Sequence, residues 1–353
     1  FYKAVKSPNR MASTMSQVML GIRIECAECH HHPFDRWGQT DFFGMRAFFA
    51  QVRYKKSSRG EMLIAQGNPV TKHPRTGEVI QAFALGTQMP TANPPNDRRD
   101  KLANWLTAPE NPWFASNIAN RTWAHLMGRG IIEPVDDVRL TNPPTNPELL
   151  KGLTKAFVDA GFDFRKLLKL IIQTDAYQRS SEVNETNERD EQNYSRFLFK
   201  QLEAEVMLDA ICQTTGVAEK FQGVPVGSRA IDLWDSSVPH YFLETFGRPV
   251  RATACECERI SEPTVSQVLH ILNSAGIENK LSHEAGSIRQ ISSKYENNEI
   301  AIQRLYLTFF NRYGDKKEIA TAVHYMGQGS NRRQSLEDIA WSMLNSLEFL
   351  FNH

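Results

Sequence analysis

The chain contains 353 residues, of which 41 are basic and 40 acidic, so its formal net charge at pH 7 is +1. This length allows one large domain or two ordinary ones, and the near-neutral balance gives no support for nucleic acid or an acidic membrane surface as a partner. No run in the sequence approaches the roughly 18 consecutive apolar residues of a membrane-spanning helix. We therefore expect no nucleic-acid partner and no membrane span, and the oligomeric state stays open.

Two helices are predicted near the start of the chain. Residues 11–25 predict an amphipathic helix that leads into a Cys-x-x-Cys-His motif, because apolar side chains recur there at helical spacing: Met15, Val18, Met19 and Ile22. A second helix, with an aromatic face, is predicted over residues 40–52. Residues 53–97 mix charged side chains with short β-favouring runs and turn signals, which is typical of a few strands and loops. We place a domain boundary near residue 95.

Helices dominate the remainder of the chain, with polar or loop-rich segments at 182–195 and 216–262. Apolar stripes between Gly, Pro and Asn signals predict helices over 97–110, 111–130, 146–161, 162–181, 202–216, 263–282, 299–314, 316–327 and 335–351. The expected fold class is mainly α, with helical bundle domains and a small connecting region of strands and loops. The expected domains are 1–95, with the Cys-x-x-Cys-His motif, and 96–353.

The motif at residues 26–30 matches the requirements for covalent haem. Two thiols three positions apart can reach the two vinyl groups on one porphyrin edge, and the histidine after the second thiol can bind the iron. Cys26, Cys29 and His30 supply these groups. Such haem is attached on the exported face of the bacterial inner membrane, so the motif predicts a periplasmic or otherwise exported protein.

A haem that only transfers electrons also needs a second axial ligand. Histidines 31 and 32 are too close to His30 in sequence to reach the opposite face of the ring. The remaining candidates are Met45, His73 and His125. Each has a plainer explanation, as a packing or surface residue. Asp35 is expected to cap the turn or to hold an imidazole N–H from behind the ligands.

The same residues also match part of a metal site without porphyrin. Zinc binds thiolates and imidazoles in a tetrahedron, and a Cys-x-x-Cys pair with a nearby histidine supplies much of that set. The ligands of a zinc or iron ion would then come from Cys26, Cys29, His32, Cys255 and Cys257. A third alternative involves neither group: the first two cysteines form a disulfide or stay free thiols.

Other conspicuous residues have mainly structural interpretations. Cys255 and Cys257 alternate with glutamates, so both thiols would lie on one side of an extended segment, either packed inward or as a ligand or redox pair. Cys212 stands alone at helical spacing and is expected to be a small buried residue. Arg121, His125 and the pair Asp136-Asp137 are expected to form a salt-bridge network. No phosphate loop, nucleophile elbow or dinucleotide fingerprint is present, which weakens the case for an enzyme.

Several long segments carry a resemblance to a known family: QVMLGIRIECAECHHHPFDRWGQTDFFGMRAFFAQV, the stretch that begins DRRDKLANWLTAPENPWF, ACECERISEPTVSQVLHILNS and LNSLEFLFNH. Together they resemble planctomycete-type, cytochrome-c-associated exported proteins built from two consecutive domains of unknown function. The family motif Cys-Ala-x-Cys-His-x-His-Pro-Phe-Asp maps here onto Cys26, Cys29, His30, His32 and Asp35.

The resemblance implies export, a mostly helical fold and a haem or metal site at the motif. A cytochrome module often stands upstream in this family, so that module and other redox proteins of the cell envelope are the expected partners. The opening Phe1-Tyr2, without an initiator methionine, suggests that residues preceding it are missing. From the sequence we expect an exported cell-envelope protein with haem c for electron transfer or sensing, or alternatively a structural or interaction protein that binds zinc or iron. A redox role is favoured over that of an envelope hydrolase that uses the His-rich turn with a metal.

Overall fold

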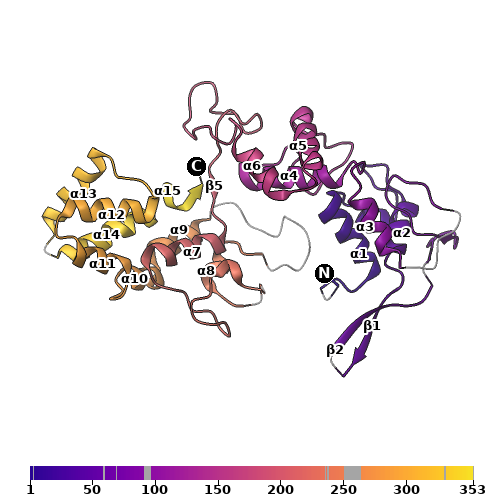
Figure 1. Ribbon diagram of the computed structural model, residues 1–353, viewed down its shortest axis with the longest axis horizontal. Coiled ribbons are helices and arrows are strands. Elements are labelled where there is room, and N and C mark those ends of the chain that lie inside the picture. Colours follow the sequence, from indigo (N-terminus) through magenta and orange to yellow (C-terminus); the bar gives the residue numbers. More distant parts are fainter. Residues whose placement is uncertain are drawn as a thin grey trace. The chain divides into compact units, whose positions relative to one another are not determined.

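The computed structural model describes the whole chain except Lys3, Arg59, Pro69, residues 91–96, Asp235, Ser237, residues 250–263, Ser330 and His353. Within the described residues the chain forms fifteen α-helices and three sheets of two strands each (Figure 1). The expected mainly α fold is therefore confirmed. None of the helices in this part of the chain is both long and apolar enough to cross a membrane.

The described residues form two compact units, each with its own apolar core. The first unit contains residues 1–198, and the second contains the described residues from Phe199 onward. The domain boundary that we expected near residue 95 falls within residues 91–96, outside the described residues, and it stays a prediction.

The first unit combines helices with two short hairpins. Its elements are α1 (Pro8–Met15), the π-helical turn η1 (Ser16–Leu20), the 3₁₀ turn η2 (Glu25–Glu28), α2 (Gln39–Ala47), β1 (Val52–Ser57), β2 (Gly60–Ala65), β3 (Thr71–Lys72), β4 (Val79–Ile80), α3 (Arg99–Leu106), α4 (Phe114–Met127), α5 (Pro147–Asp159) and α6 (Phe164–Ile172). The strands β1 and β2 pair antiparallel, as do β3 and β4. All four strands lie in or at the edge of the segment for which strands and loops were predicted.

Two apolar clusters hold the first unit together. In one, α1, η1 and α2 pack with α3, and Phe42, Phe49 and Leu102 are almost fully buried there. In the other, α4 packs with α5 and α6 around the buried Trp123 and Leu167. Burying side chains of this size contributes about 1.5–3 kcal/mol each, so these contacts are the main stabilising term of the unit.

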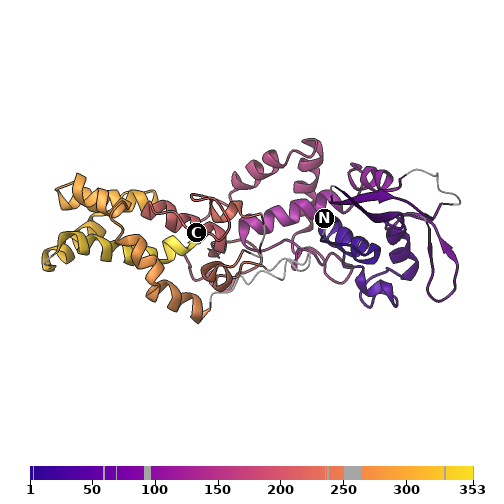
Figure 2. The same ribbon diagram turned by 90° about the horizontal axis from the view of Figure 1, so that it is seen from below.

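The second unit is an assembly of short helices in which α12, α13 and α14 pack against one another (Figures 1 and 2). Its elements are β5 (Lys200–Gln201), α7 (Ala204–Thr215), the 3₁₀ turn η3 (Ala230–Asp232), α8 (Tyr241–Thr245), α9 (Val265–Asn273), α10 (Ala275–Leu281), α11 (Ser287–Lys294), α12 (Asn298–Phe310), α13 (Lys316–Gln328), α14 (Arg332–Leu344), α15 (Leu347–Leu350) and β6 (Phe351–Asn352). Strands β5 and β6 pair antiparallel.

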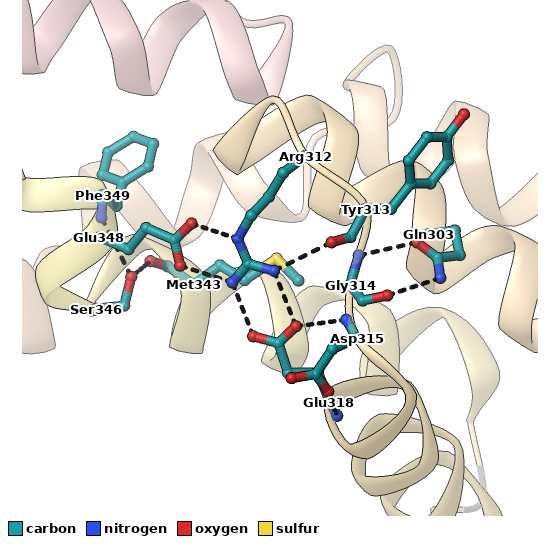
Figure 3. Close-up of polar contacts among 10 residues, drawn as sticks. All are labelled: Gln303, Arg312, Tyr313, Gly314, Asp315, Glu318, Met343, Ser346, Glu348 and Phe349. Carbon is teal, nitrogen blue, oxygen red and sulfur yellow. Dashed lines mark hydrogen bonds and ion pairs between the residues drawn. The ribbon is translucent and has the colours of Figure 1, made fainter. Parts of the chain in front are cut away.

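One arginine connects three of these helices (Figure 3). Arg312, just after α12, donates to both carboxylate oxygens of Glu318 in α13 at 2.8 and 2.9 Å, and to both oxygens of Glu348 in α15 at 2.6 and 2.8 Å. The two carboxylates raise the pKa of Arg312, and the hydrogen bonds from Arg312 lower the pKa of Glu318. Glu318 also closes a capping box with Asp315 at the start of α13. We call these four residues the Arg312 clamp.

Some helix boundaries differ from those predicted. The helix expected over 11–25 begins at Pro8 and ends at Leu20 because Gly21 adopts a left-handed conformation with φ of 73°. The segment 263–282 forms two helices, since Ser274 between them is extended. Helices α8 and α11 were not predicted. Both are short, so their formation depends on tertiary packing, which a local sequence pattern does not show.

Candidate cofactor or metal centre at the Cys-x-x-Cys-His turn

The segment that precedes the motif is held by a tight contact at Gly21. A Cβ atom at this position would lie 2.7 Å from Cγ2 of Val138 and 2.8 Å from Oδ1 of Asn117. The carbonyl oxygen of Gly21 accepts a hydrogen bond from the Val138 N–H at 2.8 Å. Only glycine meets both the space and the backbone requirement here, so the entry to the motif is fixed against α4 and the segment after it.

A buried polar network, which we call the Asp136 joint, strengthens this attachment. Asp136 is fully buried; its carboxylate forms an ion pair with Arg23 and accepts a hydrogen bond from Gln17 at 2.6 Å. Asp137 pairs with Arg139 at 3.2 Å. Ion pairs are therefore present at Asp136 and Asp137, but with Arg23 and Arg139, which were not predicted. Arg121 donates to Asn117 and to the Gln17 carbonyl, and the predicted network of Arg121 and His125 with the two aspartates stays a prediction.

The cysteines lie just beyond this joint, on the 3₁₀ turn η2. Cys26 lies within η2, and Cys29 directly follows it. Side chains three positions apart in a 3₁₀ turn are nearly eclipsed, so both thiols lie on one side. Both are exposed and free. The buried Ala27 between them anchors the turn to the core beneath.

The three histidines differ in the hydrogen bonds of their rings. Nδ1 of His30 lies 2.6 Å from the carbonyl oxygen of His31. A carbonyl only accepts, so Nδ1 carries the proton and, in the neutral ring, Nε2 keeps its lone pair. In contrast, Nδ1 of His32 accepts from the Phe34 N–H at 3.2 Å, which places the proton of the neutral ring on Nε2. His30 therefore has the tautomer that a metal ligand bound through Nε2 needs, with its second nitrogen held by a carbonyl.

The residues that follow form a closed turn. The His32 N–H donates to the Trp37 carbonyl at 2.8 Å, and the Arg36 N–H donates to Oδ1 of Asp35 at 2.7 Å. Asp35 was expected either to cap the turn or to hold an imidazole N–H. Its observed hydrogen bond, accepted from the Arg36 N–H, is of the kind that stabilises a turn. At Gly38 a Cβ would lie 2.9 Å from the His31 ring, so glycine allows this ring to approach the backbone.

The three candidates for a distal haem ligand occupy different environments. Met45 in α2 is fully buried in the core, so its sulfur is not accessible from the surface. Nδ1 of His73 accepts from the Arg75 and Thr76 amides at 3.2 Å each, in the turn between β3 and β4. His125 lies exposed on α4 and is engaged in a further interaction. The structure brings none of the three into a described contact with Cys26, Cys29 or His30.

The remaining cysteines add nothing to the site within the described residues. Cys255 and Cys257 lie in residues 250–263, outside that part of the chain. Among the residues that are described, no group of three or more His, Cys, Asp and Glu side chains is arranged as a preformed metal site. Cys212 packs against the core of the second unit, as expected, and burial raises the pKa of its thiol.

A groove beside the turn was not predicted. It has a volume of about 230 Å³ and is lined by Ile22, Asp35, Arg36, Trp37, Trp113, Val138, Arg139 and Leu140. Its residues come from segments more than one hundred positions apart, so no local pattern could have identified it. The Pro33-Phe34 turn forms one neighbour of the groove, because Arg139 lies over the Phe34 ring at 5.1 Å.

Comparison with models of protein families gives two matches to the chain. The model of PSCyt2, a protein of unknown function (DUF1549), matches residues 2–54, and the model of PSD1, a protein of unknown function (DUF1553), matches residues 98–326. The chain is thus built from two consecutive domains of unknown function. Since the second match covers more than half of the chain, the chain belongs to the PSD1 family. The Cys-x-x-Cys-His turn lies within the PSCyt2 match.

This result confirms the resemblance at the level of the two domains. A search of curated proteins and a search of solved structures found no match to the chain. The association with cytochromes, the export and the bound group remain predictions.

Proposed function

We propose that the chain is an exported protein of the cell envelope that carries haem c on Cys26 and Cys29, with His30 as an axial iron ligand. It would serve electron transfer or sensing, with other envelope redox proteins or an upstream cytochrome module as partners. The observation that carries this proposal is the 2.6 Å contact between Nδ1 of His30 and the His31 carbonyl oxygen, because it leaves Nε2 of the neutral ring with its lone pair in a residue that directly follows the second of two exposed thiols.

The residues present fit a covalently attached porphyrin on three counts. Both thiols are free, both are exposed and they lie on the same side of a turn. The bound haem would supply a one-electron redox couple. The chain itself would hold the porphyrin by two thioether bonds, and it would keep the His30 imidazole oriented through the His31 carbonyl.

The test is expression in a host that exports the chain and matures c-type cytochromes. We expect a red protein with a Soret band and a peptide around residues 26–30 that is heavier by one haem. Cys26→Ser and Cys29→Ser should each lose one thioether bond, and the matched control Cys212→Ser should change neither colour nor mass. A colourless wild-type protein with an unmodified peptide would refute the proposal.

The alternative is a zinc or iron ion without porphyrin, which would make the chain a structural or interaction protein. The exposed Cys26 and Cys29 thiols support it equally well, but the His32 ring would have to give up its hydrogen bond from the Phe34 N–H, because binding through Nδ1 uses the accepting lone pair and binding through Nε2 places the proton on Nδ1. Elemental analysis separates the two ideas, because a zinc protein is colourless, contains about one metal ion per chain and loses it to a chelator.

A further inference from the structure

We propose that helix α9 and the pocket at its carboxyl end dock an amphipathic helix of a partner protein. The apolar face of the partner helix would cover α9, and one of its lysine or arginine side chains would enter the pocket. This inference concerns the second unit only and does not depend on haem or metal at the cysteines. It rests on the exposed face of α9, on the carboxylates of the pocket and on the continuity of the two.

The outward face of α9 is apolar. Four aliphatic side chains stand at positions i, i+3, i+4 and i+7, so they form one stripe along the helix. Their exposed fractions are 76% at Val265, 54% at Val268, 53% at Leu269 and 39% at Leu272. Single apolar residues are common on protein surfaces, whereas a contiguous apolar row is typical of an interaction surface. We call this row the α9 stripe.

A polar residue on the inward side fixes the orientation of α9. Gln267 is 2% exposed, and its amide nitrogen donates to the Thr245 carbonyl at 3.1 Å. Its amide oxygen accepts from the Gln201 side chain at 3.2 Å and, as part of a capping box, from the Thr264 N–H at 3.1 Å. Turning the stripe inward would break these three hydrogen bonds, so the buried amide holds the stripe outward.

The stripe ends in a pocket of about 430 Å³, because Leu272 belongs to both. The pocket is formed by the end of α9 with α10 and α14, and Leu281 and Trp341 supply apolar lining. Its charged lining residues are all acidic: Glu278, Glu337 and Asp338. The volume lies within the usual range of about 300–1,000 Å³ for ligand pockets, so the pocket has room for one long basic side chain.

The carboxylates give the pocket an excess of negative charge. Asp338 accepts from the Tyr325 hydroxyl at 2.8 Å, a bond that leaves its charge in place. Glu337 is paired with Arg333 at 2.7 Å, but the same arginine also pairs with Glu284. Among the described residues that line the pocket there is no Lys, Arg or His. A lysine or arginine of a partner would therefore meet opposite charge, while its methylene groups would cover the apolar lining.

Complementarity favours a protein helix over two other occupants. A row of apolar residues at helical spacing is covered well by a second helix, whose side chains pack into it. A second copy that pairs through α9 would bring no lysine or arginine to the carboxylates, because α9 contains neither. An anionic membrane surface would be repelled by the acidic pocket. A helix that combines apolar and basic residues satisfies both parts of the surface.

The test is a calorimetric titration of the full chain with three synthetic helical peptides. The first carries leucines at i, i+3, i+4 and i+7 and an arginine one turn beyond each end of the row. The second replaces both arginines by glutamate, and the third keeps the composition of the first but spreads the leucines around the helix. We expect saturable binding of the first, about tenfold weaker binding of the second and no saturable binding of the third. No saturable binding of the first, or equal affinity for the first and the second, would overturn the proposal.

Two variants of the chain separate the stripe from the pocket. Leu269→Ser should weaken the arginine and glutamate peptides alike, about tenfold, whereas Glu278→Gln combined with Asp338→Asn should weaken only the arginine peptide, severalfold. The matched controls are Leu347→Ser on α15 and Glu299→Gln on α12, which are exposed, lie outside the stripe and the pocket and should change neither affinity. Affinities that stay unchanged in the first two variants, or that fall as much in the controls, would contradict the proposal. The unfolding midpoint of each variant shows whether its fold is intact.

The other two occupants would give distinct results. A dimer of the chain in sedimentation velocity that Leu269→Ser dissociates would show that a second copy covers the stripe. Co-sedimentation with vesicles of phosphatidylcholine and phosphatidylglycerol that Leu269→Ser abolishes would show a membrane-binding face. Either result would overturn the assignment of the stripe to a partner helix.

Discussion

The segment from Gln17 to His32 has two halves, which differ in whether their polar groups have hydrogen-bond partners in the protein or face solvent. In the first half, up to Ile24, the side chains of Gln17 and Arg23 donate to Asp136, and the Val18 carbonyl accepts from the Asn117 side chain. In the second half, Cys26, Cys29 and Nε2 of His30 are presented to solvent. The first half therefore stabilises the fold, while the second leaves its candidate ligand atoms exposed. A motif that mixes many polar residues can be divided in this way only once their partners are known.

The largest expected effect is at the Asp136 joint. Asp136→Ala removes the acceptor of Arg23 and Gln17 and leaves a cavity in a fully buried position. Breaking a buried pair typically costs about 3–5 kcal/mol. The free energy of unfolding of the first unit, measured by urea denaturation, should therefore fall by this amount. The control is Asp159→Ala, because Asp159 pairs with Lys155 on the exposed face of α5 and should cost only about 0.5 kcal/mol. Equal costs for the two variants would show that the joint is not the stabilising half.

Gly21→Ala tests the entry to the motif. The new Cβ would meet Val138 and Asn117 and would also have to adopt a positive φ, so we expect a loss of about 3 kcal/mol in the free energy of unfolding. Gly77 is a matched control, since its φ is also 73° but nothing lies within 4 Å of its Cβ position. Gly77→Ala should therefore cost only the conformational part, about 1 kcal/mol. A loss at Gly21 no greater than at Gly77 would rule out the steric contact.

The Arg312 clamp extends the comparison to the second unit. Arg312→Ala should destabilise that unit by about 1–2 kcal/mol, a modest figure because the arginine is partly exposed and screened by solvent. Hydrogen bonds from Arg312 lower the pKa of Glu318 below its usual value near 4.5. A lowered pKa in the folded state stabilises the fold above the unfolded pKa, and this contribution fades as the pH falls through the folded pKa.

The difference in unfolding free energy between wild type and Arg312→Ala should consequently shrink between pH 6 and pH 3. Arg312→Lys serves as the control for charge, because lysine keeps the attraction but cannot donate to two carboxylates in the same planar arrangement. A difference that stays constant over this pH range would mean that the clamp acts through packing alone.

The smallest effect on stability is expected at the exposed half of the segment. Cys26→Ser and Cys29→Ser, measured without any bound group, should change the free energy of unfolding by no more than about 0.5 kcal/mol, as is usual for exposed positions. Thermal unfolding of the apo protein checks this. A loss of several kcal/mol would mean that the thiols pack into the fold and would weaken their assignment as ligands.

Local signals were sufficient for much of the fold. The starts of α5, α6 and α13 follow from caps that can be read directly: Asn146 before a proline, Asp163, and the capping box of Asp315 with Glu318. Gly128 ends α4 in a left-handed conformation, two residues before the predicted end of this helix at residue 130. These features act over three or four residues, so the chain does not need its tertiary partners to reveal them.

The features that the sequence did not predict depend on contacts between segments far apart in the chain. The groove joins Ile22 to Trp113 and Leu140, and the Asp136 joint connects Arg23 to a residue more than one hundred positions away. The motif residues themselves were evident from spacing, but the proton position on His30 depends on a hydrogen bond that only coordinates can show. The sequence therefore indicates which residues are candidate ligands, and the structure shows which of them are exposed and how their rings are hydrogen-bonded.

The pairing of β5 with β6 has a mechanical consequence. Lys200 lies opposite Asn352 and Gln201 opposite Phe351, so the strand that opens the second unit and the strand that follows α15 run side by side in opposite directions. A pulling force applied at the outer ends of these two strands would break their hydrogen bonds one after another before it unfolded the helices. The start of the second unit is thus joined to the strand after α15 by a short pair of two-residue strands, and this pair would be the first part to separate under tension.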